Sequence, residues 1–284
     1  MKRLLRISCL MVFGVVTGVA QTAWQPGKNL VPLRGQIQHI YFLPHALGNA
    51  TTPARKILFA PGDGGWRGFA IQIASGLAAQ GNDVYALDTK HYLASFTHGP
   101  QHLTTLAVMR DFHELAARMQ AQPNETISLV GWSTGGGLVV LAGANGDKAL
   151  YNGLIAISLG KTNLLGWRCW DNLTYLTGKL PHEPTYPTET YLRQTAPLPV
   201  FIIQSSHDQF IPNKDAEELF VQLKPPKRFR LIHAHDHSFN GARPEFFATL
   251  QRGLAWLAQH EQRRAASHAS ASHPETQDLS AVPN

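Results

Sequence analysis

The sequence predicts an α/β protein with a mostly parallel central sheet and helices on both faces. Short apolar runs alternate with amphipathic segments along most of the 284-residue chain. Runs that are apolar at nearly every position are typical of parallel strands, because helices cover both of their faces. No repeat or interdomain linker interrupts the alternation, which favours one large domain.

Glycine, proline and polar residues bound the apolar runs and place the elements in order. The expected strands are residues 36–43, 56–60, 83–88, 126–130, 153–158, 200–204 and 228–232. The expected helices include residues 69–79, 103–119, 138–144, 215–223 and 244–259. Residues 161–195 break the alternation and are rich in Trp, Tyr, Pro and Leu. We interpret them as a small cap inserted over the carboxyl edge of the sheet, with an ordinary surface loop as the alternative.

Both chain ends lie outside the expected domain of residues 21–262. Residues 1–20 combine a basic start, a short apolar stretch and small residues near a cleavage point, which predicts a signal peptide. A retained membrane anchor is the alternative. We therefore expect a periplasmic or secreted protein. Residues 263–284 contain mainly Ala, Ser, His and Pro near the end and are expected to be disordered.

Composition limits the classes of partner and the source of stability. Removing the signal peptide removes Cys9 and leaves Cys169, so the mature chain has no internal disulfide and relies on its core. The formal net charge is +6, but Lys and Arg are scattered and no nucleic-acid motif is present. We expect no nucleic-acid partner. Solubility explains the charge, and peripheral contact with an anionic membrane is the alternative.

Residues 131–135 read Gly-Trp-Ser-Thr-Gly and place Ser133 between an apolar strand and a helix of small residues. The pattern G-x-S-x-G in this setting predicts a nucleophile elbow, a sharp turn that exposes the serine hydroxyl. Glycine is needed on both sides because the helix must pack closely behind the strand. The alternative is a glycine-rich turn in which the serine has no chemical role.

A serine alcohol needs a base, and the base needs a group that orients it. Asp208 follows the strand at residues 200–204 and is the expected acid, with Asp88 as the alternative. His237 lies in the loop after the last strand and is the expected base. His235 is the alternative, because His233 lies too close to the strand end.

Negative charge on the substrate oxygen would need waiting backbone N–H groups. We expect one from Thr134, directly after the nucleophile, and one from Asp63 or Gly64 in the glycine loop at residues 61–66. This loop lacks the Lys-Ser/Thr pair of a phosphate-binding P-loop. The histidine loop reads H-x-H-D-H, whereas metallo-hydrolases use H-x-H-x-D-H, so no metal or other cofactor is expected.

The order of glycine loop, elbow, acid and histidine resembles the α/β-hydrolase superfamily over roughly residues 36–259, and the resemblance implies the α/β-hydrolase fold. Residues 62–66 (Gly-Asp-Gly-Gly-Trp) and 87–93 (Leu-Asp-Thr-Lys-His-Tyr-Leu) resemble the bacterial virulence-protein family of VirJ and AcvB. That resemblance implies export, an association with type IV secretion, and hydrolysis of the aminoacyl ester lysyl-phosphatidylglycerol. The elbow differs, because the family usually has Tyr-Ser-Phe-Gly where this chain has Trp-Ser-Thr-Gly.

The sequence therefore predicts an exported serine hydrolase that cleaves a carboxylic ester through an acyl-enzyme. A small-molecule or lipid ester is the expected substrate, with an aminoacyl-phospholipid as one candidate. The alternative is a non-enzymatic periplasmic adaptor or secretion-associated protein on a hydrolase fold, since fold alone does not confer activity.

Overall fold

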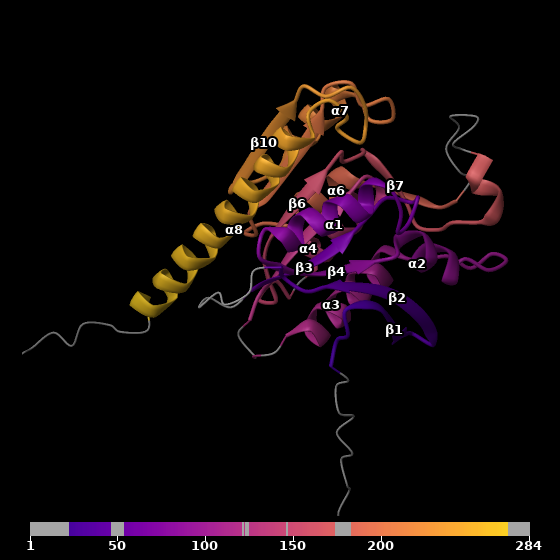
Figure 1. The fold of residues 1–284 in the computed structure, drawn as a ribbon, viewed down its shortest axis with the longest axis horizontal. Coiled ribbons are helices and arrows are strands. Elements are labelled where there is room, and N and C mark those ends of the chain that lie inside the picture. Colours follow the sequence, from indigo (N-terminus) through magenta and orange to yellow (C-terminus); the bar gives the residue numbers. More distant parts are fainter. Residues whose placement is uncertain are drawn as a thin grey trace, which may run out of the picture.

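A computed structural model describes residues 23–46, 54–120, 122, 125–145, 147–173 and 183–271. The predicted signal peptide and the end of the predicted tail lie outside these residues. The described chain is built around an eight-stranded sheet with the strand order β1-β2-β4-β3-β5-β6-β9-β10 (Figure 1). A second, two-stranded sheet pairs β7 with β8.

The elements keep the alternation that the sequence predicts. The strands are β1 (Gly27–Leu33), β2 (Gln36–Leu43), β3 (Arg55–Ala60), β4 (Asn82–Leu87), β5 (Ile127–Trp132), β6 (Tyr151–Ile157), β7 (Thr162–Leu164), β8 (Thr185–Pro187), β9 (Val200–Ser205) and β10 (Lys227–Ile232). The helices are α1 (Phe69–Ala79), α2 (Thr89–Ser95), α3 (Thr105–Met119), α4 (Thr134–Ala144), α6 (Thr188–Leu192), α7 (Asn213–Gln222) and α8 (Arg243–Ala271), with the 3₁₀ turn η1 (Cys169–Leu173).

The large sheet is antiparallel at one edge and parallel elsewhere. β2 pairs antiparallel with both β1 and β4, and every pairing from β4 to β10 is parallel. Parallel strands need crossover connections, and α1, α3, α4, α6 and α7 lie on these connections. Their carboxyl ends therefore meet at one edge, where the loops that follow them can form a site.

Side chains of each inner strand divide between two hydrophobic cores. In β3, Ile57 and Phe59 pack with α1 and α8, whereas Leu58 points to the opposite face and packs with α3 and α4. This follows from the two-residue period of a strand. The predicted α/β class, with helices on both faces of a mostly parallel sheet, is confirmed.

Helix α4 is the central helix of the molecule, and all its residues are buried. Its small side chains allow β5, β6 and α3 to approach it closely. The edge strand β10 instead alternates half-buried and exposed residues, and only its last residue, Ile232, is buried. Burial thus decreases from the middle of the sheet, where the elbow lies, toward its edges.

The segment between β6 and β9 is an insertion with its own small sheet. β7 and β8 pair antiparallel, and the N–H of Leu103 donates to the carbonyl of Leu165 at 3.0 Å, which ties the insertion to the main domain. Trp167 is buried, and Arg168 forms an ion pair with Glu183. The insertion is therefore packed structure in its described parts, and the role that we predicted for it as a cap stays a prediction.

Helix α8 extends into the region that the sequence assigned to the disordered tail. It continues to Ala271, and its last turns extend away from the sheet (Figure 1). Ala and Arg at these positions favour a helix. Glu261 accepts a hydrogen bond from Asn152, and Arg264 donates to the carbonyl of Tyr151, which hold the helix against the sheet. No helix within the described ranges has both the length and the apolar composition that a membrane crossing requires.

Candidate active site

Ser133 occupies the sharp turn between β5 and α4. Its backbone has φ 57° and ψ −125°, a conformation that non-glycine residues adopt rarely and at a cost. Its N–H donates to the carbonyl of Ile157 at 2.8 Å, which fixes the turn against β6. The structure thus gives Ser133 the strained geometry that the elbow motif predicts.

The elbow glycines are required by close backbone approach. A Cβ on Gly131 would lie 2.2 Å from the carbonyl oxygen of Gly135, and one on Gly135 would lie 1.9 Å from that of Ala60. Both distances are far below van der Waals contact. Glycine at these positions therefore allows α4 to pack directly behind β3 and β5.

Asp208 and His237 form a hydrogen-bonded pair at the carboxyl edge of the sheet. His237 Nδ1 lies 2.7 Å from Asp208 Oδ2. The Asp208 side chain is fully buried and that of His237 is 8% exposed, so water screens the pair weakly. An imidazole held at Nδ1 by a carboxylate has its Nε2 free to accept a proton.

The environment of Asp208 favours its charged form. Burial alone would raise the pKa of this carboxyl, but the hydrogen bond and charge of His237 and the N–H of Phe210 hold it below the ordinary value. Oδ1 also accepts from the N–H of Ile211 at 3.0 Å. Asp208 is therefore a carboxylate at neutral pH and orients the imidazole.

The alternative acid and base residues lie elsewhere. Asp88 caps α2, where its side chain accepts from the N–H of His91. His233 and His235 are exposed and, unlike His237, do not line the cavity beside Ser133. Among the described residues, no group of His, Cys, Asp and Glu side chains could hold a metal ion.

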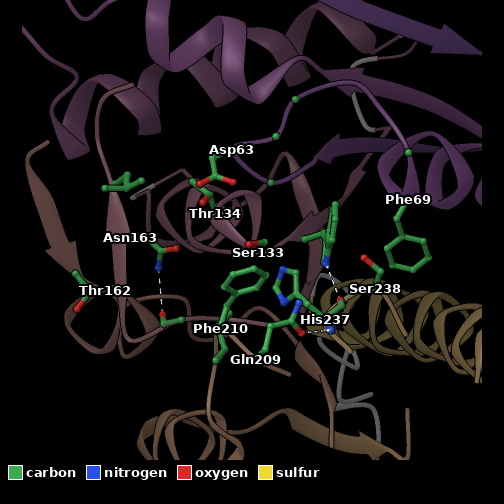
Figure 2. Close-up of a pocket in the computed structure, with 18 of the residues that line it drawn as sticks. Asp63, Phe69, Ser133, Thr134, Thr162, Asn163, Gln209, Phe210, His237 and Ser238 are labelled. Atoms are coloured by element: carbon green, nitrogen blue, oxygen red, sulfur yellow. Dashed lines mark hydrogen bonds between the residues drawn. The ribbon is translucent and has the colours of Figure 1, made fainter. Parts of the chain in front are cut away.

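Ser133 and His237 share a cavity of about 610 Å³. Figure 2 shows Ser133 in the middle of this cavity, with Thr134 and Asp63 on one side in the view and the rings of His237 and Phe210 on the other. No hydrogen bond joins Ser133 Oγ to the imidazole in the described part of the chain. Such bonds are often long in an enzyme without substrate and tighten when substrate binds.

Apolar and polar side chains line different parts of this cavity. The rings of Phe69, Trp132 and Phe210 form much of the apolar wall. The insertion contributes residues 161–164, and Asn163 uses its amide N–H groups on the carbonyl of Gly160 and the hydroxyl of Thr188. The insertion therefore forms part of the wall around the candidate nucleophile.

The glycine loop after β3 lies against the nucleophile. A Cβ on Gly62 would be 3.2 Å from Ser133 Cβ and 3.6 Å from its Oγ. The N–H of Gly65 closes a turn onto the carbonyl of Gly62. Gly64 and Thr134 both line the cavity, and no hydrogen bond within the described ranges uses either of their N–H groups. The loop and the start of α4 thus bring the expected oxyanion donors to the same cavity as Ser133.

Comparison with known proteins agrees with this architecture. The solved structure of the α/β hydrolase GrgF from Penicillium sp. sh18 superposes with a TM-score of 0.60 at 14% identity, covering 82% of this chain and 98% of that one. The chain has the α/β-hydrolase fold. The esterase domain of a Rhodothermus marinus protein gives a TM-score of 0.57 at 17% identity, with 82% and 98% covered.

Sequence comparison connects the chain to two bacterial groups. Residues 55–158 match the family model of the bacterial virulence protein VirJ, so the resemblance predicted from the first half is confirmed. The uncharacterized protein YfhR of Escherichia coli O157:H7 is 24% identical over 197 residues, 69% of this chain and 68% of that protein. The VirJ match covers β3 through β6 and therefore includes both the glycine loop and the elbow.

Proposed function

We propose that this protein is an exported serine hydrolase that cleaves carboxylic esters. The observation that carries the proposal is the buried Asp208–His237 pair, which lines one cavity with the strained Ser133. The strained backbone of Ser133 supports a chemical role, because such strain is concentrated at functional sites. The fold shared with esterases is consistent with this chemistry.

In the proposed reaction Ser133 Oγ attacks the ester carbonyl while His237 Nε2 accepts the hydroxyl proton. Asp208 holds the imidazole in position and stabilises its positive charge. The N–H of Thr134 and that of Asp63 or Gly64 donate to the oxyanion. His237 then gives its proton to the leaving alcohol, and water, activated by the same imidazole, releases the acid from the acyl-enzyme.

The cavity suits an ester with an apolar part, because aromatic rings form much of its wall. The match to a bacterial virulence-protein family is in line with export. The family resemblance of the sequence makes an aminoacyl-phospholipid one candidate substrate. The predicted signal peptide supports the periplasm or the exterior as the location.

Substitution of the nucleophile tests the proposal. In Ser133→Ala, we expect hydrolysis of 4-nitrophenyl butyrate to fall at least about 10³-fold, since loss of the nucleophile removes the acyl-enzyme route. A fluorophosphonate probe should label the wild-type protein and not this variant. Ser75→Ala, an exposed serine on α1, is the matched control and should keep both properties.

Two outcomes would contradict the proposal. A Ser133→Ala protein with wild-type hydrolysis would exclude this nucleophile. A wild-type protein that neither hydrolyses a panel of esters, including aminoacyl lipids, nor reacts with the probe would instead support the adaptor alternative.

A further inference from the structure

The backbone around His237 is held by side chains from three other parts of the chain. The carbonyl of Asp236 accepts from Ser205 Oγ at 2.7 Å, and the N–H of His237 donates to Gln209 Oε1 at 3.0 Å. The carbonyl of His237 accepts from Trp132 Nε1 at 3.3 Å. Both peptide groups that flank the imidazole are therefore fixed by side-chain hydrogen bonds.

Each of these side chains lies close in sequence to Ser133 or Asp208. Trp132 directly precedes the nucleophile, Gln209 directly follows the acid, and Ser205 ends the strand that leads to the acid. The Trp132 ring also lies 5.2 Å from the His237 ring. We call Trp132, Ser205 and Gln209 the histidine clamp. The clamp links the base to both partners through bonds that do not include the reacting atoms.

The histidine loop has its own bonds apart from the clamp. The Asp236 carboxylate accepts from the N–H of Ser238 at 2.9 Å and of Asn240 at 3.1 Å. The N–H of Phe239 also donates to the Asp236 carbonyl at 3.0 Å. These local bonds close the turn by themselves. The clamp bonds are therefore not needed to close the turn. They fix the position of the turn relative to β5 and β9.

Resting on the proposed function, we propose that Trp132, Ser205 and Gln209 are positioning residues that hold His237 in line between Asp208 and Ser133. Ser205 is fully buried and outside the cavity wall, so it acts without touching substrate. Gln209 is exposed and lines the cavity, so its replacement leaves no void in the core, and the KM of its variant reports any direct contact with substrate. A displacement of about 1 Å at a catalytic group can lower the rate up to about 100-fold, so small hydrogen bonds suffice for a large kinetic effect.

Kinetics of matched variants test this role. In Ser205→Ala and Gln209→Leu, we expect kcat for 4-nitrophenyl butyrate to fall about tenfold with KM changed by less than about threefold. The rate of fluorophosphonate labelling should fall by a similar factor. Gln209→Glu keeps an acceptor for the His237 N–H and should lose clearly less than Gln209→Leu. The control is Ser128→Ala, a fully buried serine on β5 whose hydroxyl bonds to Asn152 far from the triad.

The outcomes distinguish failure of the positioning role from failure of the proposed function and from a general loss of stability. Thermal unfolding of Ser205→Ala and Ser128→Ala should shift by comparable amounts, while only Ser205→Ala should lose kcat. Wild-type kcat and labelling in both Ser205→Ala and Gln209→Leu would overturn the clamp while leaving a reactive Ser133 in place. Equal kinetic losses in Ser205→Ala and Ser128→Ala would also overturn it. Failure of the hydrolase proposal itself would be seen earlier, as an unlabelled wild-type protein.

Discussion

Gly135 and Gly62, both near Ser133, lie where the neighbouring atoms leave little room for a side chain, but the neighbouring atoms differ. Gly135 faces the backbone of β3, where a Cβ would meet the carbonyl oxygen of Ala60 at 1.9 Å. Gly62 faces the Ser133 side chain, where a Cβ would make a tight contact at 3.2 Å. Backbone cannot move as a side chain does, so the same methyl group has different consequences at the two positions.

We predict that Gly135→Ala lowers the free energy of unfolding by about 3 kcal/mol or more, because β3 and α4 must separate. Gly62→Ala should fold with a smaller loss, about 1 kcal/mol, and lower ester hydrolysis by displacing the Ser133 side chain. Urea denaturation and 4-nitrophenyl butyrate kinetics measure the two effects. A Gly135→Ala protein as stable as wild type would show that the packing described for the elbow is wrong.

The sequence placed the candidate triad, because Ser133 has a motif and Asp208 and His237 each follow a strand in the expected order. It did not indicate Trp132, Ser205 or Gln209 as functional. Their bonds run from a side chain to a distant backbone, and no spacing in the sequence records such a contact. Hydrogen-bond networks of this kind become visible only in three dimensions.

At the scale of elements, an ion pair between the exposed Arg34 and the buried Asp111 links the antiparallel edge of the sheet to α3. Arg34, in the turn between β1 and β2, donates to the Asp111 carboxylate through Nε at 2.6 Å and Nη2 at 2.7 Å. Tyr92 OH donates to the same carboxylate at 2.6 Å. The Asp111 side chain is 1% exposed, so three hydrogen bonds compensate its charge away from water.

Removing the Asp111 carboxylate should destabilise the antiparallel edge of the large sheet. We expect Asp111→Ala to lower the free energy of unfolding by about 2–3 kcal/mol, because the buried Tyr92 hydroxyl loses its acceptor and Arg34 loses its ion pair. Glu189→Ala breaks the exposed Arg193–Glu189 pair on α6 and should cost at most about 1 kcal/mol. Chemical denaturation measures the free energy of unfolding of the two variants. Equal effects of the two substitutions would contradict a special role for burial.

The elements missed from the sequence are those that depend on neighbours. β1 is an edge strand with a proline at position 32 and a largely exposed face, so its pattern is weak. β7 and β8 are short strands that pair with each other, α6 is a short helix that packs on α4 and α7, and the short helix α2 was also not expected. The longer α1, α3 and α8 carry a helical pattern of their own. Only the end of α8 was misjudged, because its anchors on Asn152 and Tyr151 are distant in sequence.

At the scale of the whole molecule, the core that contains α3 and α4 buries tyrosines whose ionisation is linked to folding. Burial raises the pKa of Tyr85, Tyr92, Tyr151 and Tyr186 above the ordinary value. A pKa that is higher in the folded state stabilises the fold below the unfolded value and loses this contribution as the pH rises above it. Stability should therefore decline above about pH 10.

We predict that these tyrosines ionise together with unfolding during alkaline titration. Tyrosinate absorbance should rise in the same pH interval as the loss of circular dichroism. The protein in concentrated denaturant, where burial is absent, should titrate at about pH 10 and provides the control. Full tyrosine ionisation at that pH while the circular dichroism stays native would contradict the burial of these four tyrosines.

The segment between β6 and β9 is encoded between Ser133 and Asp208 and supplies residues 161–164 to the cavity wall. Its two-stranded sheet is separate from the large sheet, although α6 of the same segment packs on α4 and α7. The wall residues can therefore change while the reactive groups stay in place. In such an architecture, residues that contact the substrate and residues that carry out the reaction lie in different segments of the chain. A chimera that carries a relative's insertion would show whether the substrate preference changes while the hydrolytic activity is retained.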